Sequence, residues 1–265
     1  MLRKGFRRDF LILLASLIDE FEYQSIRYKL WRLSTGEDYR PQNFARSLSR
    51  ILSVGDIEKI EKNGEVYFRL TSKGLKNLKE SIPIFKFDQK AWDGYWRIVI
   101  FDINEKNKNQ REALRDKLLS LGFGMWQKSV YITPYKIEKE INEYFQTNKM
   151  ESSCVCLVAK RSDMGDDRQL AEKIWRLDDL NDEYEEFIFQ CQKFLDEEYN
   201  GKEELSEFKK LWQWYKDLIL KDPHLPEELL PSDWKGNKAK ELFKKFLLKK
   251  TRSQPVKEKE EAGLV

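Results

Sequence analysis

The sequence predicts an α+β protein of three folded parts and a short polar tail. Residues 1–85 combine helical spacing of apolar residues with one strong hairpin signal. Residues 86–163 alternate strand-like runs with helical segments, whereas residues 164–250 carry helical spacing alone. The remaining residues, 251–265, are polar. A chain of 265 residues is long enough for three such domains.

Three helices followed by a hairpin are expected in the first part, which is the order of a winged helix-turn-helix. The first helix carries an apolar stripe at i, i+3, i+4, i+7, i+8 and i+11 from Phe10. A second short helix is expected over Ser25–Leu33, and a third follows it. Asn63–Gly64 then centres a hairpin over Ile57–Leu70, because both turn positions require a positive φ.

The third helix, for which Pro41 suits the first turn, has one apolar face and one face suited to DNA. Its apolar face is formed by Phe44, Leu48, Ile51 and Leu52. No acidic residue occurs between Tyr39 and Ser53, and Arg, Asn and Ser can reach phosphates and base edges in a major groove. The alternative is an ordinary solvated face, which usually mixes both charge signs. We therefore predict DNA contacts from this helix, its flank and the hairpin tip: Arg40, Gln42, Asn43, Arg46, Ser47, Arg50 and Lys62.

Excess positive charge is concentrated in the first part. Residues 1–85 hold 16 Lys/Arg and 11 Asp/Glu, although the net charge of the whole chain is only +3. A module that binds a polyanion needs such a distribution. No apolar run approaches the roughly 20 residues of a membrane span. Asp19 and Glu20 directly follow the first apolar block, which argues against a secretion signal, so we expect a cytoplasmic protein.

No cofactor or metal site is expected. The chain has three cysteines and one histidine, His224, from which a zinc site can hardly be built. Cys154 and Cys156 alternate along a strand-like run, where cysteines behave as small core hydrophobes. Gly94 and Gly124 are isolated, so no Gly-rich phosphate loop is expected.

The middle part has the order β-α-β-β-α-β of a ferredoxin-like domain. An apolar strand runs from Arg97 to Ile103, and a helix follows from Asn109 to Leu121. Residues 125–133 bend and are expected to form two strands. A helix over residues 137–145 and a strand over residues 153–159 complete the order.

Motifs in the middle part resemble two known families. FDI at 101–103 and QKSVY at 127–131 resemble the small nuclease subunit of CRISPR spacer acquisition. The longer string WDGYWRIVIFDINE from Trp92, followed by LGFG at 121–124, more closely resembles the central domain of PaaX-type transcriptional repressors. That resemblance implies a nuclease-like fold behind a winged helix. Asn104 departs from the repressor family, which commonly has proline there.

Asp102 is the candidate catalytic residue of an alternative function. In the nuclease family the matching aspartate is the proposed metal ligand at a dimer twofold axis. A Mg²⁺-assisted cut requires several oxygen ligands and an open coordination position, and one carboxylate per chain makes a thin site. The favoured interpretation is that Asp102 accepts hydrogen bonds from the following loop and helix start. No catalytic or metal-binding residue is therefore predicted.

The last part is expected to be helical from Arg168 onward. Leu180–Leu195 and Leu205–Ile219 mark two long amphipathic helices, and Leu242–Leu247 mark a last short one. The proline-punctuated DPHLPEELLPSDW at 222–234 precedes this last helix. It resembles the C-terminal signature of the same repressor family.

Aromatic residues of the last part form a candidate ligand site, and those singled out are Trp212, Tyr215 and Trp234. The family resemblance implies a small-molecule effector, because family members release DNA on binding an aromatic acyl-coenzyme A, typically phenylacetyl-coenzyme A. Helical spacing of aromatic residues is more often core packing, and that alternative is favoured.

Together these features predict a homodimeric transcriptional repressor that binds double-stranded DNA. The long helices offer a dimer surface, which a palindromic operator would require. One alternative is a metal-dependent nuclease acting through Asp102. Another is an assembly adaptor that uses the winged helix for protein contacts, and it would lack the steep salt dependence that phosphate contacts impose.

Overall fold

The structure, a computed structural model, describes residues 25–27, 41–62, 65–81, 91–160 and 165–252. It contains helices and two antiparallel sheets, which confirms the predicted α+β class. The chain divides into two compact units. One comprises residues 1–77, 183–219 and 235–265, and the other comprises residues 78–182 and 220–234.

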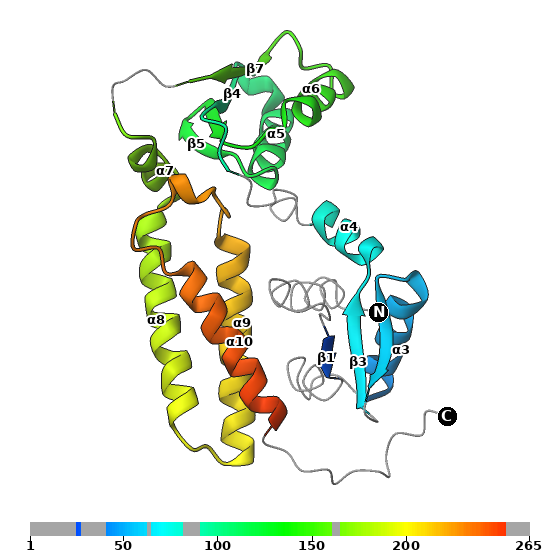
Figure 1. Cartoon of the computed structure of the whole chain (residues 1–265). Helices are drawn as coiled ribbons and strands as arrows, with labels where there is room; N and C mark the ends of the chain where they lie inside the picture. The colour runs from blue at the N-terminus through cyan, green and yellow to red at the C-terminus, as the bar shows by residue number, and fades with distance from the viewer. Residues whose placement is uncertain (1–24, 28–40, 63–64, 82–90, 161–164, 253–265) are drawn as a thin grey trace. The chain divides into compact units, whose positions relative to one another are not determined.

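The first sheet has three antiparallel strands in the order β1-β3-β2. The elements around it are β1 (Ser25–Arg27), α3 (Pro41–Val54), β2 (Ile57–Lys62), β3 (Glu65–Leu70) and α4 (Ser72–Ser81) (Figure 1). β2 and β3 pair without a break from Ile57↔Leu70 to Lys62↔Glu65. The predicted pair of strands on either side of Asn63–Gly64 is therefore present.

The helix expected over Ser25–Leu33 is wrong at its start. Ser25–Arg27 form β1, which pairs with β3 at Ser25↔Arg69 and Arg27↔Tyr67. Pairing with a strand distant in sequence fixes this backbone, and local helical spacing carries no information about such a partner. The rest of that segment and the helix expected from Phe10 lie outside the described residues.

The second sheet has four antiparallel strands in the order β5-β6-β4-β7. Its elements follow as β4 (Trp96–Phe101), the short 3-10 helix η2 (Glu105–Asn107), α5 (Lys108–Ser120), β5 (Gly124–Gln127), β6 (Val130–Thr133), α6 (Glu138–Thr147) and β7 (Cys154–Ala159). β4 is central, with β6 on one side and β7 on the other. Residues of β4 and β6 are buried together with residues of α5 and α6: Val99, Phe101, Tyr131, Leu114, Leu118, Ile141 and Phe145.

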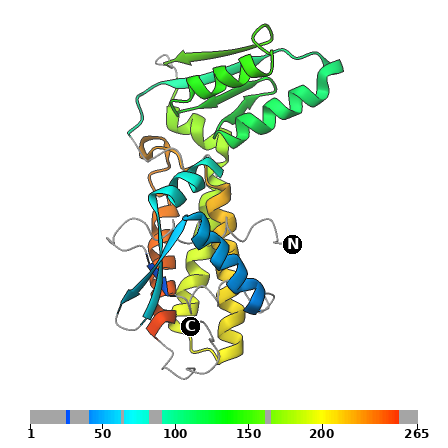
Figure 2. The ribbon, with the colours of Figure 1, turned by 90° about the vertical axis from the view of Figure 1, so that its right-hand side faces the viewer.

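The remaining elements are helical: α7 (Asp167–Trp175), α8 (Leu177–Asp196), α9 (Gly201–Lys221), the 3-10 helix η3 (Glu227–Leu229) and α10 (Gly236–Arg252). α8, α9 and α10 lie side by side in both views (Figures 1 and 2). α10 is longer than the short helix that the sequence predicts. No helix in the described part of the chain is long and apolar enough to cross a membrane.

Candidate nucleic-acid interface

Helix α3 has one buried and one exposed face. Leu48 and Ile51 are buried at 8% and 3% exposure, so they anchor the helix to its own domain. Arg46 and Arg50 are exposed on the opposite side. Neither arginine makes an ion pair with any described residue, and no acidic residue occurs within α3. Two guanidinium groups are thus presented to solvent on one acid-free helix.

The structure describes the side chains of only two of the predicted DNA-contact residues, Arg46 and Arg50. Gln42, Asn43 and Ser47 lie on α3, but their side chains are outside the described part. Lys62 ends β2 with its side chain also outside that part, and Arg40 precedes the described helix. These residues remain predictions.

Two serines on the exposed face of α3 were missed in the sequence prediction. Ser49 and Ser53 are exposed beside Arg46 and Arg50, at the spacing i, i+3, i+4 and i+7. The signal that identifies them is the position of the buried residues around the helix. Ser49 lies about 160° from Ile51, whereas the predicted Ser47 lies only about 40° from it, at 100° per residue.

A compact junction holds the end of α3 against the start of α4. Thr71 Oγ1 donates to the carbonyl oxygen of Gly55 at 2.6 Å and accepts the N–H of Gly74 at 3.0 Å. The fully buried Asp56 accepts the side-chain amide of Asn77 at 2.6 Å. A Cβ on Gly74 would lie 1.9 Å from the carbonyl oxygen of Asp56. Glycine is therefore required at position 74. The hydrogen bonds of the junction fix the start of α4 relative to the end of α3.

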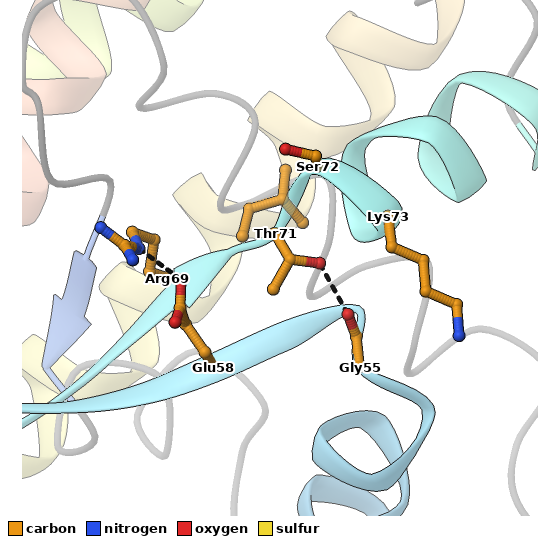
Figure 3. A pocket seen from close by; sticks show the side chains of 7 residues that line it. Gly55, Glu58, Arg69, Thr71, Ser72 and Lys73 are labelled. Carbon is orange, nitrogen blue, oxygen red and sulfur yellow. Dashed lines mark hydrogen bonds and ion pairs between the residues drawn. The ribbon is translucent and has the colours of Figure 1, made fainter.

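A shallow hollow beside this junction is lined by Gly55, Glu58, Arg69, Leu70, Thr71, Ser72 and Lys73 (Figure 3). Arg69 Nε forms an ion pair with Glu58 Oε1 at 2.6 Å. Lys73 Nζ donates to the carbonyl oxygen of Val54 at 2.7 Å. Both cations of the hollow have protein partners, which favours a structural role over ligand binding.

Asp102 lies exposed just beyond the end of β4. Its backbone N–H donates to the carbonyl oxygen of Ser153 at 2.8 Å, but its carboxylate makes no hydrogen bond to any described residue. The expectation that Asp102 accepts bonds from the following loop and helix start stays a prediction. In that loop, Asn104 Oδ1 accepts the N–H of Lys106 at 3.0 Å. Within the described residues, no group of three potential metal ligands is found.

A buried arginine, Arg97, is the centre of a hydrogen-bond network at the start of β4. Arg97, 3% exposed, donates to both carboxylate oxygens of Asp93 at 2.8 and 2.7 Å and to Glu138 Oε1 at 2.7 Å. It also donates to the backbone oxygens of Tyr95 and Pro134. The hydrogen bonds from Arg97 hold the pKa of Asp93 well below its usual value, and Asp93 in turn raises the pKa of Arg97. This network ties together parts of the domain that are distant in sequence.

The proline-punctuated segment 222–234 packs against the same domain. The buried Tyr135 hydroxyl lies 2.8 Å from the carbonyl oxygen of Pro223 and 2.6 Å from that of His224. His224 has a positive φ of 51°, and its N–H donates to Asp222 Oδ1 at 2.6 Å. Leu225 and Leu229 are buried in the core of the second sheet. Residues 222–234 therefore form a segment that covers this core, called the strap below.

The three predicted ligand-binding aromatic residues belong to two clusters. Trp212 and Tyr215 are buried and stack on Phe243 of α10, with ring centroids 5.8 and 3.8 Å away. Trp234 packs instead against the core of the second sheet. Such ring stacking is the core packing that helical spacing favours.

The acid-free helix α3 with its exposed arginines, followed by the paired strands β2 and β3, has the features that predict a DNA-binding regulator from the sequence. Comparisons with known proteins specify the family. Residues 89–171 match the model described as PaaX protein central Cas2-like domain, and residues 175–254 match the PaaX-like protein C-terminal domain. The chain belongs to the PaaX-type transcriptional repressor family.

One curated relative is the transcriptional repressor PaaX of Escherichia coli (strain K12). It is 26% identical over 189 residues, which cover 66% of this chain and 58% of the relative. The match thus spans less than two thirds of the relative's length. A solved structure, uncharacterized protein Rv0674 from Mycobacterium tuberculosis, matches with a TM-score of 0.55 and 17% identity. The match covers 93% of this chain and 97% of that one, and it shows the fold alone.

Proposed function

We propose that this protein is a DNA-binding transcriptional repressor whose first domain is a winged helix-turn-helix. The observation that carries the proposal is α3, with Arg46 and Arg50 exposed opposite the buried Leu48 and Ile51. Arginine binds phosphates and guanine edges through several N–H groups at once. Family membership and the printed name of the curated relative support the same function.

The test is binding of purified protein to fragments of DNA from upstream of its own gene, at two salt concentrations and with or without Mg²⁺. We expect protection of a two-part site, uncut DNA, and affinity that falls steeply as salt rises. Absence of salt-dependent binding would favour an assembly adaptor. Mg²⁺-dependent fragmentation that disappears in Asp102→Asn would instead support a nuclease.

We propose that the chain forms a homodimer through the face of the second sheet that α5 and α6 leave uncovered, called the open face below. Ile100 lies opposite both Val130 and Val155, so these three side chains share a face. Ile100, Val155 and the neighbouring Leu157 are 40%, 44% and 45% exposed. β7 is also an edge strand, whose free backbone groups can pair with another chain. A palindromic operator requires such a homodimer.

Light scattering on Leu157→Glu tests this dimer. We expect monomers, because a carboxylate would be buried without a partner at the interface. Val158→Glu is the matched control: Val158 is 52% exposed on the same strand but lies opposite Arg97, on the other face. Dimers in both variants would remove the open face as the interface.

The proposed effector is an aryl acyl-coenzyme A that shifts the dimer to a state unable to span both half-sites. Family resemblance alone supports this part, because the predicted ligand residues Trp212, Tyr215 and Trp234 pack in two different hydrophobic clusters. Titration of phenylacetyl-coenzyme A into the protein–DNA complex tests it, with free coenzyme A as control. Release by the thioester alone is expected, and release by neither compound would exclude this effector.

A further inference from the structure

We infer that Ser49 is a base-reading residue of α3, flanked by the arginines that hold the duplex. This inference rests on the proposed function and names a specificity-determining group within it. The argument depends on the position of Ser49 around the helix, the state of its hydroxyl, and the chemistry of its neighbours.

The position of Ser49 follows from the buried face. With Leu48 and Ile51 turned inward, Ser49 lies about 100° from the first and about 160° from the second. It follows Arg46 by three residues and precedes Arg50 by one, and all three are exposed. A helix that lies in a major groove with both arginines toward the DNA therefore also turns Ser49 toward it.

The hydroxyl of Ser49 has no hydrogen-bond partner among the described residues, in contrast to that of Ser53. Ser53 Oγ donates to the carbonyl oxygen of Arg50 at 2.9 Å, which is the usual local bond of a serine within a helix. Ser49 Oγ makes no hydrogen bond to any residue that the structure describes. A serine hydroxyl is able both to donate to and to accept from a base edge.

Serine and arginine contribute differently to recognition. The arginines carry charge, so their contacts to phosphates strengthen binding to every sequence and depend on salt. A serine hydroxyl carries no charge, and it can hydrogen-bond either a phosphate oxygen or a base edge, but only a bond to a base edge gives a sequence preference. Ser49 should therefore affect sequence preference without affecting the salt slope.

The experiment compares wild type, Ser49→Ala, Ser47→Ala and Ser120→Ala. Ser120 is a matched control, an exposed helical serine at the end of α5. Preferred sites are selected from randomised duplexes, and affinities for the selected site and for unrelated DNA are measured at two salt concentrations. Alanine favours helix more than serine does, so a loss in Ser49→Ala cannot come from a weakened helix.

We expect Ser49→Ala to reduce discrimination at one base position about fivefold, the size of one hydrogen bond. Binding to unrelated DNA and the salt slope stay unchanged, and the two control variants resemble wild type. The inference is overturned if Ser49→Ala keeps the full base preference, or if Ser47→Ala shows the loss instead. Wild type without any salt-dependent DNA binding would overturn the proposed function as well, so the two failures are distinguishable.

Discussion

Arginines occupy opposite environments in the two sheet-containing regions. In α3, Arg46 and Arg50 are exposed and unpaired among the described residues. At the entry to β4, Arg97 is buried and donates to two carboxylates and two backbone carbonyls. The difference shows that the same type of side chain faces solvent in one region and connects several buried hydrogen-bond acceptors in the other. What separates them is whether the protein itself supplies the acceptors.

The largest loss of stability is expected from substituting Arg97, which removes its buried hydrogen-bond network. Arg97→Met removes the buried cation shared by Asp93 and Glu138, and the exposed Lys136, 3.4 Å from Asp93, compensates only in part, so the free energy of unfolding should fall by about 3 kcal/mol. Urea unfolding followed by circular dichroism measures this. Arg111→Met is the control, because Arg111 reaches its nearest carboxylate only at 4.0 Å and should lose little stability. Equal losses in both variants would contradict a special role for Arg97.

Acid should weaken the same network. Because Arg97 lowers the pKa of Asp93 in the folded protein, this ion pair stabilises the fold fully above about pH 4, near the pKa of an unperturbed aspartate. That stabilisation decreases as the pH falls further toward the lowered pKa. Unfolding measured from pH 6 to pH 2 should show a steeper loss in wild type than in Arg97→Met. Parallel pH profiles would mean that Asp93 does not contribute through its charge.

The exposed arginine should affect binding and leave stability unchanged. Arg46→Ala is expected to weaken binding to the preferred site by about 1–3 kcal/mol, with the free energy of unfolding unchanged. Fluorescence anisotropy with labelled duplex measures the affinity. Lys193→Ala, on α8, removes the same charge from another exposed position and should bind as wild type does. Wild-type affinity in Arg46→Ala would remove α3 as the recognition helix.

The sequence predicted elements whose evidence is local. The helix expected over Asn109–Leu121 is α5 (Lys108–Ser120), since its apolar spacing is a property of the segment alone. The pair of strands flanking Asn63–Gly64 was predictable for the same reason. The exposed placement of Arg46 and Arg50 also followed from helical spacing within α3.

Features that depend on distant partners were missed. β1 exists because Ser25–Arg27 pair with β3, and nothing within those three residues indicates that pairing. From the sequence, Arg97 is only one polar residue in an apolar strand. Its role depends on Glu138, 41 positions away, which it contacts in the folded protein. The exposure of Ser49 required knowing which apolar residues of α3 are buried.

The smallest loss of stability is expected from removing an uncharged buried group, the hydroxyl of Tyr135. Tyr135→Phe removes the hydroxyl that lies between the carbonyl oxygens of Pro223 and His224, and burial makes their loss of a donor costly. We expect the free energy of unfolding to fall by about 1–2 kcal/mol, with faster amide exchange confined to the strap over residues 222–234. Tyr95→Phe is the control, because Tyr95 is 45% exposed. Unchanged exchange in the strap would mean that Leu225 and Leu229 hold it without the hydroxyl. Packing alone, rather than a buried polar contact, would then fix the strap to the second sheet.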